Sequence, residues 1–289
     1  MQNQNQQAGF TLVEMIIVIV ITGIIGGMVA IFIKAPVQGY VDSSRRAEMT
    51  DIADTALRRL SRDIRTAVPN SVRVANPAGT NTYIEFLPTR DGGRYRLNGP
   101  GNVLNFGTPD GSADIIGGSI DFKTDDQIVI GSTQSDGNPP YDDTITGILR
   151  AHDNAKTGVQ TTVDFTNTAL PASAEVQGQR FDIVPGDQQA VTYACLNKGT
   201  DGSGDGTGTL TRYWHYGFHA TQQSPSGIAA NTAPVSAHSN AILADKVSDC
   251  AIIYDVVNQR NALVSIRLEI KRGGESISLY HTIHVNNVP

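Results

Sequence analysis

The feature that most constrains this chain is an apolar run near its N-terminus. From Met15 to Ile33 the run is interrupted only by Thr22 and by glycines. A helix over residues 10–33 would be about 36 Å long, at about 1.5 Å per residue, which is enough to cross the hydrocarbon core of a bilayer. The run therefore predicts a membrane-crossing helix.

A single carboxylate, Glu14, lies just inside this apolar segment. An ionisable side chain in such a setting is costly unless it is paired, so Glu14 is a candidate functional residue. The residues before the segment, 1–8, form a short polar leader without a charged side chain.

Two simpler interpretations of the run are a secretory signal peptide and a plain membrane anchor. A signal peptide carries basic residues before its apolar region and small residues at a cleavage site after it. Here Gly9 precedes the run and the leader has no Lys or Arg. A plain anchor accounts for the hydrophobicity and leaves Glu14 unexplained.

The segment Gly9-Phe10-Thr11-Leu12-Val13-Glu14, with the apolar run behind it, resembles the processing site of type IV prepilins and pseudopilins. The resemblance implies that a prepilin peptidase cleaves between Gly9 and Phe10 and that Phe10 is then N-methylated. It also implies that Glu14 neutralises the N-terminal ammonium of a neighbouring subunit, since both charges are expensive in an apolar medium. Leaders of this family usually carry a basic residue, whereas this one has only the Met1 amine.

Helical periodicity continues beyond the apolar run. Pro36 should kink or briefly interrupt the helix, because it lacks an amide donor and crowds the preceding turn. Apolar residues then recur at steps of three and four and form one stripe. The stripe consists of Met49, Ile52, Ala53, Ala56, Leu57, Leu60, Ile64 and Val68. The helix should end before Pro69, so we expect one long helix over residues 10 to about 67.

After residue 70 the pattern changes to short alternating strands separated by turns such as Asp91-Gly92-Gly93. The expected strands cover residues 71–74, 82–87, 94–97, 103–106, 127–130, 144–150, 159–165, 181–184, 190–195, 209–216, 247–256, 262–270 and 276–285. The last three should form an antiparallel meander with one buried face. Residues 222–239 should be a surface loop.

These patterns predict an α+β, pilin-like fold, with a long N-terminal helix packed on a body rich in antiparallel β-sheet. The expected organisation is a leader at residues 1–9, a transmembrane and assembly helix at 10–34, its amphipathic continuation at 35–68, and a β-rich body at 69–289.

Charge and cysteine content narrow the class of protein. The net charge of −6 argues against a nucleic-acid partner, which requires a basic face. Cys195 and Cys250 have neither the spacing of a redox site nor enough companions for a zinc site. If the body is exported, a disulfide between them is the natural interpretation.

Two segments are weak candidates for ligand binding. Asp201, Ser203, Asp205 and Thr207 match the first part of a calcium loop, but Arg212 stands where a bidentate Glu is required. A flexible hairpin loop is the simpler interpretation. The segment from Trp214 to His219 is aromatic and holds two histidines that a strand would place about 13 Å apart. It is more typical of a core than of a metal site, although an exposed version would suit a sugar.

No nucleophile elbow, P-loop or HExxH motif is present, and we expect no enzymatic activity and no cofactor. The segments 190–195, 210–213 and 247–250, followed by the two terminal strands, resemble the W- and J-type minor pilins. The helical segment 45–54 and the ending 279–289 look most like the O-type biogenesis proteins of mannose-sensitive haemagglutinin (MSHA) pili. The resemblance implies a minor pilin with its body outside the inner membrane. Its partners would be other minor and major pilins, the prepilin peptidase and the inner-membrane assembly platform. A type II secretion pseudopilin, a tip adhesin and a free-standing membrane-anchored enzyme remain alternatives.

Overall fold

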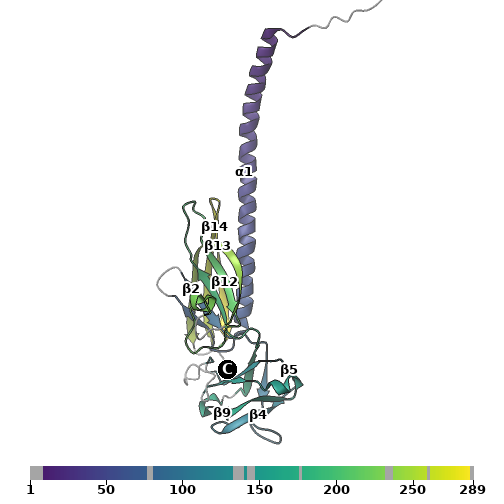
Figure 1. Ribbon diagram of the computed structural model, residues 1–289, viewed down its shortest axis with the longest axis vertical. Coiled ribbons are helices and arrows are strands. Elements are labelled where there is room, and N and C mark those ends of the chain that lie inside the picture. The colour runs from purple at the N-terminus through teal and green to yellow at the C-terminus, as the bar shows by residue number, and fades with distance from the viewer. Residues whose placement is uncertain are drawn as a thin grey trace, which may run out of the picture. The chain divides into compact units, whose positions relative to one another are not determined.

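The computed structural model describes residues 9–76, 81–132, 140–141, 147–175, 178–231, 237–258 and 261–286. The chain divides into two compact units, Met1–Glu48 and Met49–Pro289. Both are built around one helix, α1 (Leu12–Arg65), and the second holds every strand (Figure 1). The predicted combination of a long N-terminal helix with an antiparallel β-sheet body is therefore confirmed.

Helix α1 has 54 residues and continues without a break through Pro36. The interruption expected at that proline is not observed, since a proline removes one amide donor while the turns on either side keep their own hydrogen bonds. The helix ends at Arg65, close to the predicted position. Ion pairs form between residues three and four apart, from Arg45 to Asp42 at 3.5 Å and from Arg58 to Asp54 at 2.6 Å.

A seven-stranded antiparallel sheet forms the larger part of the body. Its strand order is β1-β2-β11-β12-β13-β14-β15. The strands are β1 (Arg73–Ala75), β2 (Thr82–Phe86), β11 (Val191–Leu196), β12 (Gly208–Trp214), β13 (Ser239–Asn258), β14 (Asn261–Arg272) and β15 (Glu275–Asn286). The last three form the predicted C-terminal meander, and Val264, Ile266, Leu268 and Ile270 on β14 are all buried.

The apolar stripe of α1 packs on this sheet. Met49, Ala53, Ala56, Leu57, Leu60 and Ile64 share one hydrophobic core with residues of β2 and β11 to β15. Ile52 lies at the margin of that core. The recurrence of apolar residues every three or four positions therefore identified the buried face of the helix correctly.

A six-stranded sheet is inserted between two neighbouring strands of the first. Strands β2 and β11 pair with each other, and the chain between them forms a sheet of order β7-β6-β10-β3-β4-β9. Its strands are β3 (Asp91–Tyr95), β4 (Pro109–Ile116), β6 (Gln127–Ile130), β7 (Leu149–Ala151), β9 (Thr162–Ala169) and β10 (Arg180–Val184). A separate pair is formed by β5 (Ile120–Phe122) and β8 (Gly158–Gln160).

The inserted sheet has a hydrophobic core of its own. All the buried residues of that core lie between Tyr95 and Ile183. A further cluster joins the two sheets through Leu87, Val129 and Val184, among others. No linker in the sequence marks this division, because the insertion is joined to β2 and β11 by the short connections 87–90 and 185–190.

One wrong prediction in the inserted sheet concerns a turn. The turn expected at Asp91-Gly92-Gly93 is the first part of β3. A Cβ at Gly92 would lie 2.8 Å from the Phe181 carbonyl oxygen, and one at Gly93 would lie 2.9 Å from the Phe181 ring. These glycines therefore allow β10 to approach β3 closely. A glycine inside a strand often marks such a close approach, whereas in a loop it marks a turn.

The expected strand at residues 103–106 is irregular instead. Its backbone amides donate to unrelated partners, Leu104 to the Arg96 carbonyl and Asn105 to the Asp110 carboxylate, so no ladder forms. Strands β4 and β5 were not predicted, and the segment 159–165 is divided between β8 and β9. The expected loop at 222–239 contains a short helix, α2 (Pro225–Ala229), and residues 232–236 lie outside the described residues. Two single 3₁₀ turns, η1 (Asn154–Lys156) and η2 (Ala172–Ala174), complete the elements.

Candidate functional site

The start of α1 is held by a reciprocal pair of hydrogen bonds between Thr11 and Glu14. The Glu14 amide donates to the Thr11 hydroxyl at 3.3 Å, and the Thr11 amide donates to the Glu14 carboxylate at 3.5 Å. This is a capping box, in which a threonine and a glutamate three residues apart satisfy amides that the first helical turn leaves free. Glu14 therefore points back toward the backbone next to Phe10.

The predicted cleavage position lies immediately outside this cap. Gly9 and Phe10 precede the helix and are exposed, Phe10 to 80%. A peptide bond in an exposed, non-helical segment is accessible to a peptidase. A new ammonium at Phe10 would also lie near the positive end of the helix dipole, so it needs a nearby anion.

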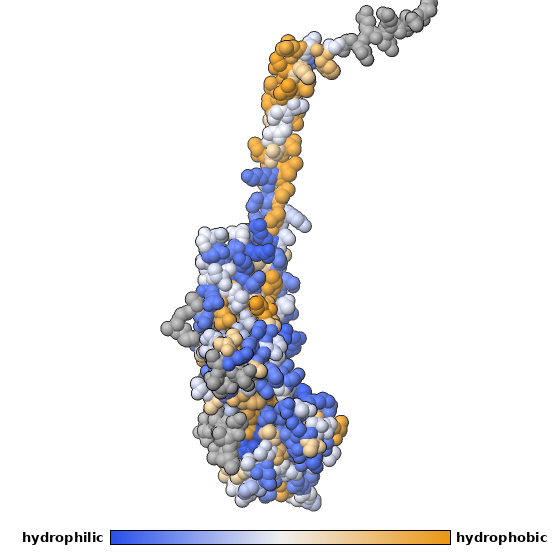
Figure 2. All heavy atoms as spheres, in the orientation of Figure 1, coloured by the Kyte–Doolittle hydropathy of each residue, from blue (hydrophilic) through white to orange (hydrophobic). Residues whose placement is uncertain are grey.

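The apolar segment of α1 has no cover within its own unit. Every large apolar residue from Phe10 to Ile33 is exposed, and Figure 2 shows this part of the helix mainly in the hydrophobic colour, interrupted by a paler band. α1 is long and apolar enough to cross a membrane, and its most apolar stretch is entirely unburied. The one hydroxyl in the run from Met15 to Ile33, on Thr22, donates to the Val18 carbonyl at 2.6 Å and so needs no outside partner.

The other end of α1 is fixed to the sheet by Asp63. Its carboxylate accepts hydrogen bonds from the Tyr193 hydroxyl at 2.6 Å and from Arg212 at 3.1 Å. Burial and the neighbouring Asp63 carboxylate raise the pKa of Tyr193, which stays a donor. Sequence reasoning missed this contact, because nothing in the pattern relates Asp63 to residues more than a hundred positions away.

A buried ion pair fixes the edge of the large sheet. Glu85 on β2 is fully buried and pairs with Arg73 on β1 at 2.5 Å, while the Tyr216 hydroxyl donates to its other oxygen at 2.7 Å. Burial raises the pKa of Glu85, and the Arg73 guanidinium opposes that rise. Arg73 also donates to the carbonyls of His219 and Ala220. The network thus fastens the segment after β12 to β1.

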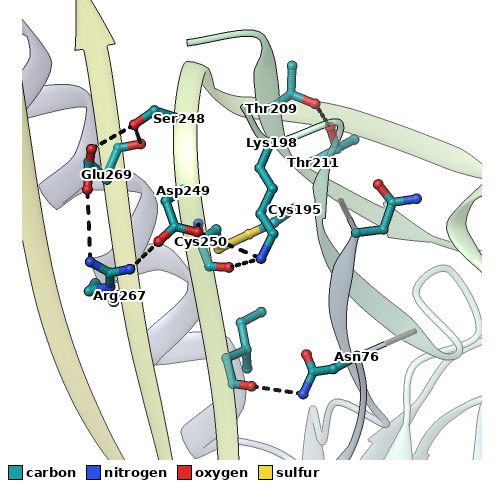
Figure 3. The surroundings of a disulfide bond; sticks show 12 residues. Asn76, Cys195, Lys198, Thr209, Thr211, Ser248, Asp249, Cys250, Arg267 and Glu269 are labelled. Carbon is teal, nitrogen blue, oxygen red and sulfur yellow. Dashed lines mark hydrogen bonds and ion pairs between the residues drawn. A yellow bond between two sulfur atoms is a disulfide. The ribbon is translucent and has the colours of Figure 1, made fainter. Parts of the chain in front are cut away.

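The two cysteines form the disulfide that their export would imply. Cys195 on β11 and Cys250 on β13 are both buried, and their Cα atoms lie 6.2 Å apart. Figure 3 shows Lys198 beside the bond, where its ammonium donates to the Cys250 carbonyl at 2.8 Å. Asp249 lies between Lys198 and Arg267 and pairs with both. The bond connects two strands that β12 separates.

The candidate calcium residues take part in local hydrogen bonds. The Asp201 carboxylate accepts from the amides of Ser203 and Asp205. Asp205 accepts from the Gly273 amide at 2.7 Å and pairs with Lys246 at 3.5 Å. The Thr207 hydroxyl donates to the Asn197 carbonyl. Asp201 and Asp205 therefore hold a turn and attach it to the β14–β15 hairpin.

The aromatic segment around Trp214 contributes mainly to the core. Tyr213 and Tyr216 are buried, and the Arg212 guanidinium lies 4.8 Å from the centre of the half-buried Trp214 ring. His219 contacts the Tyr216 carbonyl at 2.8 Å. Across the residues that the structure describes, no three His, Cys, Asp or Glu side chains are grouped so that they could hold a metal ion.

One family model matches the chain, the prokaryotic N-terminal methylation motif, over residues 4–30. The match includes Gly9, Phe10, the Thr11–Glu14 cap and most of the exposed apolar helix. The chain is type IV pilin- or pseudopilin-like. Comparison with curated proteins and with solved structures found no match. The methylation motif implies assembly of this pilin-like chain with other pilins and with membrane machinery.

Proposed function

We propose that this pilin-like chain is a minor pilin of an MSHA-like type IV pilus that acts at the filament tip or in the complex that starts assembly. The observation that carries the proposal is the capped, exposed apolar helix with Glu14 in its first turn, within the matched methylation motif. The chain would be inserted in the inner membrane with its body on the periplasmic side and cleaved between Gly9 and Phe10. Phe10 would then be N-methylated.

Assembly would proceed through the exposed helix. Packing the helix among those of other minor and major pilins removes its apolar surface from the surroundings. The Glu14 carboxylate would then exchange its contact with the Thr11 amide for the methylated ammonium of a neighbouring Phe10. An unpaired charge in an apolar bundle costs several kcal/mol, so this pairing selects one register of helix against helix. The inserted sheet makes the body bulky, which suits a subunit that begins or caps a fibre.

The test of this mechanism is substitution of Glu14. We expect Glu14→Leu to leave the protein in the inner membrane and to reduce its recovery in sheared pili at least tenfold, because the helix keeps its hydrophobicity and loses its register. Thr22→Val is the matched control, since Thr22 bonds within its own helix. Equal recovery of Glu14→Leu and the native protein would refute the mechanism.

The J-type pseudopilin of a type II secretion system is a second candidate, because pilins and pseudopilins share the methylation motif. A strain that lacks this gene separates the two. Loss of surface pili, counted by electron microscopy, supports the minor pilin. Intact pili with impaired secretion would reject that role and favour the pseudopilin. Neither role requires a catalytic site or a cofactor on this chain.

A further inference from the structure

The inserted sheet carries an open hollow where β4 meets β9, called the cavity below. Strand β9 is the last strand of the six, so one of its edges has no neighbour within this sheet. The cavity has a volume of about 390 Å³, which is within the range for small-ligand sites, roughly 300–1,000 Å³. It is lined by Asn102, Pro109, Asp110, Gly111, Ser112 and Asn167, among others.

A bulge in β9 produces this hollow. Asp110 pairs with Thr168, and Ser112 pairs with Asp164. Between these two pairs β9 advances by four residues while β4 advances by two. Gly111 lies under the bulge, where a Cβ would be only 2.7 Å from the Phe165 carbonyl oxygen. Bulges of this kind redirect side chains and are common beside functional sites. Here the bulge carries Asn167 to the cavity.

The charge of Asp110 is already compensated within the site. One of its oxygens accepts from the amides of Gly111 and Ser112, and the other accepts from the amide and the side chain of Asn105. Four donors leave this carboxylate little capacity for a cation. No basic side chain is among the lining residues of the cavity, so the lining also lacks a partner for an anion.

The remaining polar atoms suit a neutral ligand. The Asn102 side chain donates to the Ser112 hydroxyl at 2.5 Å, which leaves its carbonyl oxygen facing no donor among the described residues. The side-chain amide of Asn167, which is exposed, likewise has no hydrogen-bond partner in the described part of the chain. An amide offers both donors and acceptors, and so does a sugar hydroxyl.

From this combination we propose that the cavity between β4 and β9 binds a neutral saccharide, one or two sugar rings in size. Asn102 and Asn167 hydrogen-bond its hydroxyl groups, Ser112 supplies a further hydroxyl, and Pro109 provides the apolar contact. The site is independent of helix assembly, so it can be tested apart from the minor-pilin proposal.

The test measures binding of neutral oligosaccharides to the full-length protein in a detergent without a sugar headgroup. Ligand-observed NMR against a panel of neutral di- and trisaccharides, with sialylated ones for comparison, identifies the ligand. We expect at least one neutral oligosaccharide to bind, and Asn102→Ala and Asn167→Ala each to weaken its binding about fivefold, as for the loss of one neutral hydrogen bond. Gly111→Ala should abolish binding, since the added Cβ displaces the bulge.

Asn240→Ala is the matched control, because Asn240 is an exposed strand asparagine of the other sheet. It should bind as the native protein does. Asn102 and Asn167 are exposed, so their variants keep the proposal testable even if Gly111→Ala fails to fold. The proposal is overturned if no neutral oligosaccharide binds, if only sialylated ones bind, or if both asparagine variants retain native affinity.

Discussion

Asp182 on β10 should destabilise the body at neutral pH. Its side chain is half-buried and receives no hydrogen bond from a described residue. Burial raises the pKa of Asp182 from 3.8 to about 6, with the Arg180 guanidinium opposing the rise. The folded state therefore resists the charged form of this carboxyl more than the unfolded chain does.

The pH dependence follows from the direction of this shift. Below about pH 3.8 the carboxyl is neutral in both states and there is no penalty. The penalty accumulates between pH 3.8 and about 6 and is complete above that range, because the pKa of the folded state is the higher one. A shift of about two units corresponds to up to about 3 kcal/mol in the free energy of unfolding.

Asp182→Asn keeps the shape of the side chain and removes its charge. At pH 7.5 we expect the variant to be up to about 3 kcal/mol more stable, and at pH 4 we expect it to match the native protein. Urea unfolding of the full-length protein in detergent, followed by circular dichroism at both pH values, measures this. Asp187→Asn, at an exposed position on the following turn, is the control and should change little. A gain that is equal at both pH values, or a loss at pH 7.5, would refute the reasoning.

Two further substitutions test the contacts that hold the body together. Replacing Cys195 and Cys250 by serine opens a loop of 55-residue separation and should lower the free energy of unfolding by about 4 kcal/mol, measured by urea unfolding; an unchanged midpoint would contradict the role of the bond. Arg73→Met should cost about 3 kcal/mol at pH 7.5, because it leaves the buried Glu85 carboxylate without its cationic partner; Arg62→Met, at an exposed position on α1, should cost little, and equal losses in the two variants would count against the ion pair.

The long helix and the C-terminal meander could be predicted because their signals are local and repeated. The stripe from Met49 to Ile64 repeats the helical period, and the alternation along β14 repeats the strand period. Gly9, Phe10 and Glu14 were recognisable for the same reason, since they are adjacent in sequence.

Strands β6 and β10 of the inserted sheet were predicted, but the sheet as a separate unit was not, because long-range contacts define it. Gly92 and Gly93 have the composition of a turn, and only the approach of Phe181 explains them as part of a strand. The cavity depends on a register difference between β4 and β9, which a single strand pattern does not contain. The contacts of Asp63 with Arg212 and of Glu85 with Arg73 likewise join elements whose neighbourhood only the fold determines.

The most direct test of the central claim, that this chain is processed and assembled as a pilin-like protein, is the N-terminus of the protein in the cell. We would purify the full-length protein from cells with and without prepilin peptidase and determine its intact mass and N-terminal peptide. The account predicts a chain that begins with N-methylated Phe10 when the peptidase is present, and one that retains residues 1–9 when it is absent. An unprocessed chain in both strains, or cleavage after the apolar helix as in a signal peptide, would contradict it.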